Sequence, residues 1–170
     1  GSYLAQFLLQ KGYVVWGTCR APRNASLGNL HTLGIAGLMN IIQMTPEDFG
    51  SVSLALEQSN PDEIYFLAGQ SSVAMSFEQP AETMRSVVLG ALNLLEACRI
   101  GGKPVRLFHA GSGECFGDTQ GIPADESTPF NPRSPYAVAK SSAYWLVRNY
   151  REAYKLHACS GILFNHESPL

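Results

Sequence analysis

Short hydrophobic segments typical of β-strands alternate along this chain with longer segments of helical periodicity. Strands are predicted at residues 14–18, 40–44, 62–68, 105–110 and 158–164, and the helices at 3–9, 45–59, 81–99 and 136–154. Strands joined by helical crossovers form a parallel sheet with helices on its faces. The sequence therefore predicts an α/β fold, with functional side chains at the carboxyl ends of the strands.

Length and composition exclude several classes of protein. A chain of 170 residues, 45% of them hydrophobic, can form one domain with its own core. The net charge of −2 argues against nucleic acid as a partner. The four cysteines form no CxxC pair, so we expect free thiols, no metal site and a reducing compartment. No hydrophobic run approaches the ~20 residues of a membrane span, and a cytoplasmic location is predicted.

Gly1 and Arg20 are candidate cofactor-binding residues. Gly1 directly precedes the first predicted helix, where the final glycine of a dinucleotide-binding turn permits close helix packing, although it could equally be a chain boundary. Arg20 follows the strand at 14–18, and no Asp or Glu occurs from Gly12 to Thr45. An arginine here suits the 2′-phosphate of NADP, whereas an acid suits the ribose hydroxyl of NAD. We predict NADP, with Arg23 as an alternative and a solvated surface arginine as the other interpretation.

Four residues form a candidate catalytic group. Tyr136 and Lys140 are four residues apart at the start of a predicted helix, so both lie on one face of it. An ammonium group beside the phenol, together with a bound ribose, is expected to lower the phenol pKa toward the working pH. Ser112 and Glu114 follow the strand at 105–110 in a glycine-rich stretch. Alternatively, this stretch is a polar loop capped by serine.

Polar residues also follow two other strands. Gln70, Ser71 and Ser72 come after the strand at 62–68, and Asn165 and His166 come after the strand at 158–164. These side chains suit ligand contacts at the edge of a parallel sheet. Ordinary turn formation would use the same residue types.

Five segments carry a resemblance to a known family. They are LAGQSSV at 67–73, SFEQP at 76–80, NPRSPYAVAK at 131–140, NYREAY at 149–154 and GILFNHESP at 161–169. With these segments the chain resembles the extended short-chain dehydrogenases/reductases and, among them, the GDP-mannose 4,6-dehydratase family. The resemblance implies a Rossmann-type doubly wound parallel sheet. It also implies that residues 1–170 are a partial NADP-binding domain, without its first strand and the C-terminal substrate region.

The resemblance implies roles for particular residues. The catalytic residues would be Ser112, Glu114, Tyr136 and Lys140. The cofactor would be bound by Gly1, Arg20, Leu67, Ala68, Gln70, Ser71, Tyr136, Lys140 and His166. The substrate would be bound by Ser72, Ser112, Glu114 and Asn165. The complete protein is expected to be a homo-oligomer, a dimer or a tetramer.

The predicted reaction converts GDP-mannose to its 4-keto-6-deoxy derivative. Tyr136 would act at the C4 hydroxyl, and Glu114 would remove the C5 proton and protonate the leaving C6 hydroxyl. A 4-epimerase or 4-reductase on the same scaffold is an alternative that needs no Glu114. A catalytically silent nucleotide-binding fragment is another, and we expect a chain that spans only residues 1–170 to be inactive.

Overall fold

The computed structural model describes residues 1–22 and 27–170, and in these residues the strands are all parallel. The strands are β1 (Trp16–Cys19), β2 (Asn40–Gln43), β3 (Glu63–Phe66), β4 (Arg106–Ala110) and β5 (His157–Gly161). β1 pairs with β2, and β4 lies between β3 and β5. The predicted α/β class is confirmed. Arg23 lies outside the described residues.

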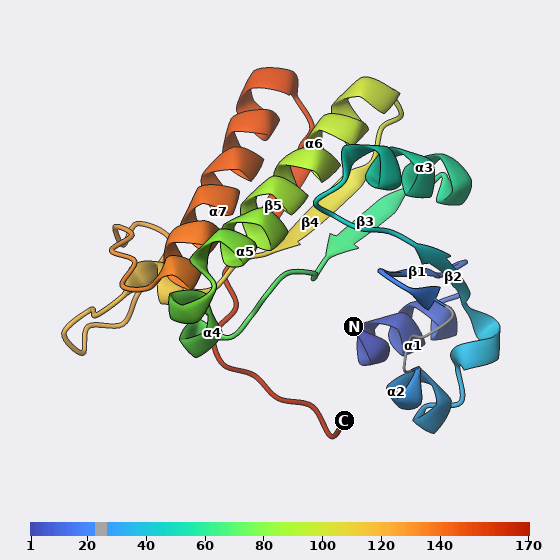
Figure 1. Cartoon of the computed structure of the whole chain (residues 1–170), viewed down its shortest axis with the longest axis horizontal. Coiled ribbons are helices and arrows are strands. Elements are labelled where there is room, and N and C mark those ends of the chain that lie inside the picture. The colour runs from blue at the N-terminus through green and yellow to red at the C-terminus, as the bar shows by residue number, and fades with distance from the viewer. Residues whose placement is uncertain (23–26) are drawn as a thin grey trace.

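Helix α1 precedes β1, and the other helices lie in the connections between strands (Figure 1). They are α1 (Ser2–Gln10), α2 (Gly28–Thr32), α3 (Phe49–Ser59), α4 (Val73–Glu78), α5 (Pro80–Met84), α6 (Gly90–Gly101) and α7 (Pro135–Tyr154). A π-helical turn, Arg85–Leu89, joins α5 to α6. The long helix predicted at 81–99 is therefore two α-helices with a wider turn between them.

The main core lies between the β3-β4-β5 sheet and helices α3, α6 and α7. Leu107 of β4 and Leu95 of α6 are almost fully buried in it. Ala139 and Ala143 of α7 are completely buried, and their small side chains let this helix pack closely. A smaller cluster of Ala5, Val15 and Ile35 lies beside β1.

A cleft lies between β1, at the edge of one sheet, and β3, at the edge of the other. No ladder joins β1 to β3 among the described residues, and both strands line a cleft of about 1290 Å³ together with α1. Val14, predicted to lie in a buried strand, lines this cleft and is 78% exposed. That part of the strand prediction is wrong, because β1 begins only at Trp16.

The start of α3 also differs from the prediction. The helix begins at Phe49, because the carboxylate of Asp48 caps it. Asp48 Oδ1 accepts hydrogen bonds from the backbone N–H of Gly50 at 2.9 Å and of Ser51 at 3.3 Å. Thr45, the predicted cap, instead donates its backbone N–H to Ser51 Oγ at 2.9 Å. Pro46 and Glu47 therefore lie in a turn before the helix.

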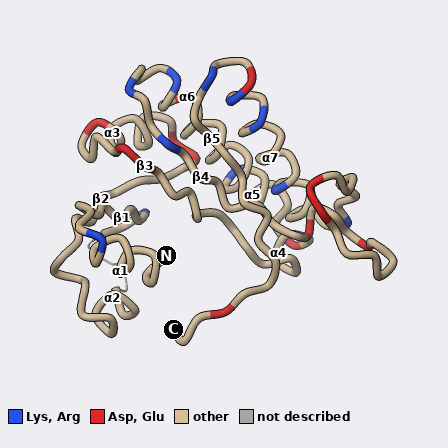
Figure 2. The backbone as a smooth tube through the Cα atoms, turned by 180° about the vertical axis from the view of Figure 1, so that it is seen from behind, with Lys and Arg blue, Asp and Glu red and all other residues tan. Residues whose placement is uncertain are grey.

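Positions of Lys and Arg and positions of Asp and Glu both occur in several parts of the backbone (Figure 2). At the C-terminal end of α7, for example, Arg148 Nε donates to Glu152 Oε1 at 2.8 Å. Within the described residues, none of the helices combines the length and the hydrophobicity that crossing a bilayer requires.

Gly117 and Gly121 lie in the loop that follows the turn at Gly113–Phe116. Substituting each of them tests how closely this loop packs. Both have positive φ, +63° and +78°. A Cβ on Gly117 would lie 2.1 Å from the backbone oxygen of Asn131, whereas a Cβ on Gly121 would meet nothing within 4 Å. We expect Gly117→Ala to destabilise the protein by roughly 3 kcal/mol or more and Gly121→Ala by about 1 kcal/mol. Thermal unfolding of both variants measures the difference; equal losses would contradict the predicted clash.

Candidate functional site

The backbone after β4 turns sharply to present Ser112. Gly111 N–H continues the ladder to Gly161 O at 2.8 Å. A Cβ at Gly111 would lie only 2.9 Å from that oxygen, so the close approach requires glycine. Ser112 then caps the short 3₁₀ turn Gly113–Phe116, with its Oγ accepting from Glu114 N at 3.3 Å. The Ser112 side chain is thereby held at the carboxyl end of β4.

The 3₁₀ turn is fixed from two directions. Gly113 N–H donates to Leu163 O at 2.8 Å, and Asn131 N–H donates to Cys115 O at 2.9 Å. The Phe116 ring lies nearly parallel to that of Phe164, with 6.2 Å between their centroids. Glu114 nevertheless has an exposed side chain. A well-held backbone thus presents a carboxylate to solvent.

Tyr136 and Lys140 lie on one face of α7, as their spacing predicts. The helix begins at Pro135 because the Ser134 Oγ accepts from Ala137 N at 3.0 Å. The side chains of both Tyr136 and Lys140 are buried. Lys140 Nζ donates to Ala110 O at 2.9 Å, at the end of β4, and lies 5.8 Å from the centre of the Tyr136 ring. The structure therefore brings these two residues to the same strand end as Ser112.

Burial controls the protonation of this group. It raises the pKa of the Tyr136 phenol above its usual value, and the nearby Ser112 hydroxyl acts in the opposite direction. Burial also lowers the pKa of Lys140. Burial, followed by the charge of Lys140, lowers the pKa of His109 to about 4. In the chain by itself the phenol pKa is raised, because the desolvation of phenolate outweighs the contact with Ser112. The expected lowering, which includes a bound ribose, stays a prediction.

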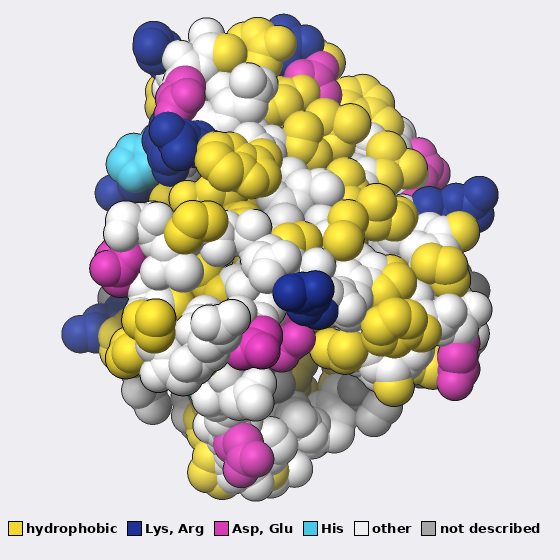
Figure 3. Space-filling view, turned by 90° about the vertical axis from the view of Figure 1, so that its left-hand side faces the viewer, with side chains coloured by type: hydrophobic (Ala, Val, Ile, Leu, Met, Phe, Trp, Pro, Cys, Tyr) yellow, Lys and Arg dark blue, Asp and Glu magenta, His cyan; other side chains and the backbone are white. Residues whose placement is uncertain are grey.

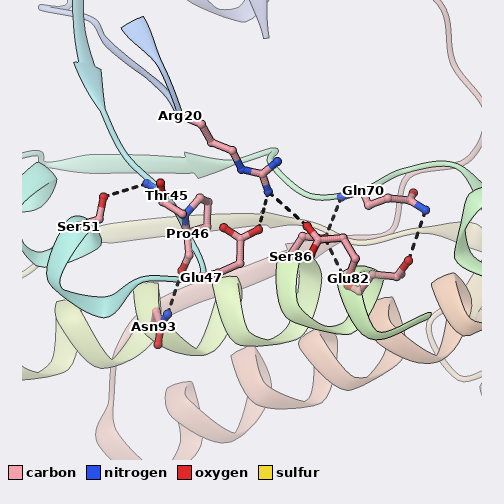
Figure 4. Close-up of polar contacts among 10 residues, drawn as sticks. Arg20, Thr45, Pro46, Glu47, Ser51, Gln70, Glu82, Ser86 and Asn93 are labelled. Atoms are coloured by element: carbon pink, nitrogen blue, oxygen red, sulfur yellow. Dashed lines mark hydrogen bonds and ion pairs between the residues drawn. The ribbon is translucent and has the colours of Figure 1, made fainter. Parts of the chain in front are cut away.

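A second group of residues lines a cleft of about 410 Å³ at the carboxyl ends of β1, β2 and β3. Arg20 follows β1, and Ala68 and Gln70 follow β3. Figure 4 shows Gln70 donating its backbone N–H to Ser86 Oγ, at 3.2 Å, and Arg20 pointing toward Glu47 and Glu82. This arrangement brings three of the predicted cofactor-binding residues together.

Sequence reasoning missed Glu47, Glu82 and Ser86 in this cleft. The segment Thr45–Asp48 does carry a signal, but its residues predict a helix start with Glu47 in the first turn. Glu82 and Ser86 lie on α5 and the π-helical turn, in a stretch predicted as one regular helix. Neither pattern indicates a contact with β1.

The other predicted residues lie in different surroundings. Gly1 and Leu67 line the larger cleft between β1 and β3. The Ser72 hydroxyl caps α4, where it accepts from Met75 N at 3.2 Å. Ser71 and Asn165 are exposed, as is His166, whose Nδ1 lies 2.7 Å from Phe164 O. Their roles toward cofactor and substrate stay predictions.

The parallel sheets and the Ser112, Tyr136 and Lys140 group at the end of β4 define a Rossmann-type unit of the short-chain dehydrogenase/reductase class. The family profile described as GDP-mannose 4,6 dehydratase matches residues 1–170. The chain belongs to this family.

Individual relatives agree with this assignment. The chain is 47% identical over 179 residues to GDP-mannose 4,6 dehydratase 1 of Arabidopsis thaliana, with 99% of the chain and 49% of the relative covered. It therefore spans about half the length of the curated relatives it matches. The fold is similar to UDP-glucose 4-epimerase of Thermus thermophilus in complex with NAD, with a TM-score of 0.83, 29% identity and coverage of 94% and 50% of the two chains. It is also similar to RMD of Pseudomonas aeruginosa complexed with NADPH, with a TM-score of 0.69, 26% identity and coverage of 83% and 50%.

The protonation state of Tyr136 can be measured directly. Because burial raises its pKa, the phenol should ionise only above pH 10, its ordinary value. The difference between the ultraviolet pH titrations of the parent and of Tyr136→Phe isolates this group from the other tyrosines. Tyr150→Phe is the comparison, since burial and Glu96 raise the pKa of Tyr150 to about 12. Ionisation of Tyr136 below pH 10 would show that the Lys140 charge outweighs burial.

Proposed function

We propose that the protein containing this chain is a sugar-nucleotide dehydratase that acts on GDP-mannose and forms GDP-4-keto-6-deoxymannose. The observation that carries the proposal is the grouping of Ser112, Tyr136 and Lys140 at the end of β4, with Glu114 on the same turn. Membership of the GDP-mannose 4,6 dehydratase family supports the choice of substrate and reaction.

Tyr136 is proposed to accept the proton of the C4 hydroxyl during oxidation at C4. Its raised pKa makes the phenolate a strong base. The ammonium group of Lys140, 5.8 Å from the centre of the ring, would favour the charged form by electrostatic attraction. Lys140 itself is oriented by the Ala110 carbonyl. Ser112, whose hydroxyl lies near the phenol, would donate a hydrogen bond to the C4 oxygen.

Glu114 is proposed to carry out the step that distinguishes a dehydratase. The C4 ketone acidifies the C5 proton, which the Glu114 carboxylate would remove. The resulting carboxylic acid would protonate the C6 hydroxyl as it leaves as water. Exposure suits this role, because the carboxylate must reach carbons beyond C4. A 4-epimerase or 4-reductase needs the other three residues but not this one.

A nicotinamide dinucleotide is the proposed cofactor. When bound, it would supply the acceptor for the hydride removed at C4 and later the donor that returns the hydride. The cleft at the ends of β1, β2 and β3 fits such a molecule, because Arg20, Ala68 and Gln70 meet there. The sequence predicts NADP specifically, from Arg20. Among residues 1–22 and 27–170, the candidate ligand does not fit the 2′-phosphate, since the Arg20 guanidinium is already paired with Glu47 at 2.5 Å.

Self-association is proposed through the side of the molecule on which α7 lies. Figure 3 shows hydrophobic side chains at several places on this side. On α7, Trp145 is 52% exposed and Tyr154 is 51% exposed. Exposed aromatic side chains on a helix are typical of interfaces between protein chains. This supports the predicted homo-oligomer.

Glu114→Gln in the whole protein tests the proposed reaction. Glutamine keeps the shape of the side chain but removes the base, so overall turnover should fall by roughly 10²–10⁴. Oxidation at C4 should survive. Mixing the variant with GDP-mannose should therefore produce reduced-nicotinamide absorbance that persists, because the second half of the reaction is blocked.

Tyr136→Phe is the matched variant, and it should suppress the absorbance change itself. Product mass identifies the reaction in the parent. Near-parental turnover of Glu114→Gln, or prompt reduction of the cofactor by Tyr136→Phe, would contradict the assigned roles. A parent protein that binds dinucleotide and GDP-mannose but changes neither would favour the silent alternative.

A further inference from the structure

The cleft at the ends of β1, β2 and β3 has a charge pattern that bears on the choice of cofactor, provided that it is the dinucleotide site proposed above. Dinucleotides bind outside the carboxyl ends of parallel strands, and the residue after the second strand of such a unit meets the adenosine ribose. In this chain β1 follows helix α1 and so takes the place of that second strand. Arg20 follows β1 and lines the cleft. The groups that touch Arg20 therefore face the ribose position.

Arg20 is held by carboxylates from two separate elements (Figure 4). Its Nη2 lies 2.5 Å from Glu47 Oε1, in the turn before α3, and 3.9 Å from Glu82 Oε1, on α5. Arg20, Glu47 and Glu82 are the charged side chains among the described residues that line the cleft. One positive and two negative charges leave this group with a net negative charge.

Glu47 is the better held of the two acids. Its side chain is 16% exposed, against 47% for Glu82. The preceding turn is anchored, because the buried Asn93 donates its Nδ2 to Pro46 O at 2.9 Å. The second carboxylate oxygen of Glu47, Oε2, is buried and has no hydrogen-bond partner among the described residues. The charge of Glu47 is therefore balanced mainly by Arg20.

This balance opposes a 2′-phosphate. If Arg20 turned toward a phosphate, Glu47 would keep a largely buried charge without its partner, which is strongly unfavourable. If Arg20 stayed in place, the phosphate would meet two carboxylates and one guanidinium among the described residues that line the cleft. A ribose with free hydroxyl groups meets neither penalty, because a hydroxyl can donate a hydrogen bond to a carboxylate.

We propose that Glu47 and Glu82 make this site select the unphosphorylated dinucleotide, so that the protein binds NAD in preference to NADP. Glu47 is the main determinant, because it is closer to Arg20 and more buried. It supplies, from the turn after β2, the acid that the segment directly after β1 lacks. Arg20 then acts as the partner that holds Glu47 in place and not as a phosphate ligand.

Calorimetric titration of the whole protein with NAD and with NADP tests the proposal without any turnover. The parent should bind NAD at least about tenfold more tightly. Glu47→Gln keeps the size of the side chain but removes one negative charge and releases Arg20, so the ratio of the two dissociation constants should move toward NADP by about tenfold or more. Glu82→Gln should move it in the same direction by less.

Glu57→Gln is the control, because it removes an exposed carboxylate from α3 that does not line the cleft, and it should leave the ratio unchanged. Circular dichroism checks that each variant is folded, and the exposed Glu82 provides a test if Glu47→Gln is not. A parent that binds NADP as tightly as NAD would overturn the proposal. So would an unchanged ratio in both Glu47→Gln and Glu82→Gln. A parent that binds neither dinucleotide would instead overturn the proposed function, and this inference with it.

Discussion

A buried ammonium group ties the longest helix to the central strand. Lys140, 7% exposed, donates from Nζ to the carbonyl oxygen of Ala110, where β4 ends. A buried cation without an acceptor would be strongly unfavourable, so this contact fixes how far α7 lies along β4. Tyr136 is one helical turn before Lys140, and Ser112 is two residues after Ala110. The position of the phenol relative to the serine therefore depends on where this ammonium group finds its carbonyl.

The part of the site that the sequence predicts is the part built from local spacing. Four-residue spacing places Tyr136 and Lys140 on one helix face, and the Ser134 and Pro135 pair marks where that helix begins. The alternation of strands and helices predicts that Ser112 lies at a strand end. These features need only the periodicity of each element and the direction of the strands. The structure agrees on the element order and on this grouping.

The part that the sequence does not predict depends on contacts between distant segments. Arg20 and Glu47 are 27 residues apart in the chain. Their pairing requires that β1 and β2 pair in the observed register, and that Asp48, not Thr45, caps α3. A helix start at Thr45 would place Glu47 inside the first turn. The π-helical turn likewise results from packing, and it places Ser86 where its hydroxyl meets the backbone of Gln70. Neither arrangement follows from a local pattern.

The end of β4 and the ends of β1 and β2 differ in the charges that they present. At the end of β4 a buried cation, Lys140, lies beside a phenol and near a histidine that burial keeps neutral, since the pKa of His109 is about 4. In the proposed reaction, such a site would stabilise negative charge that develops on a substrate oxygen. At the ends of β1 and β2 the balance is reversed, because Glu47 and Glu82 outnumber Arg20 among the described residues that line the cleft. In the proposed reaction, a dinucleotide that spans both would place its nicotinamide end near Lys140, beside the reacting substrate oxygen, and the hydroxyl groups of its adenosine ribose near the end of β1.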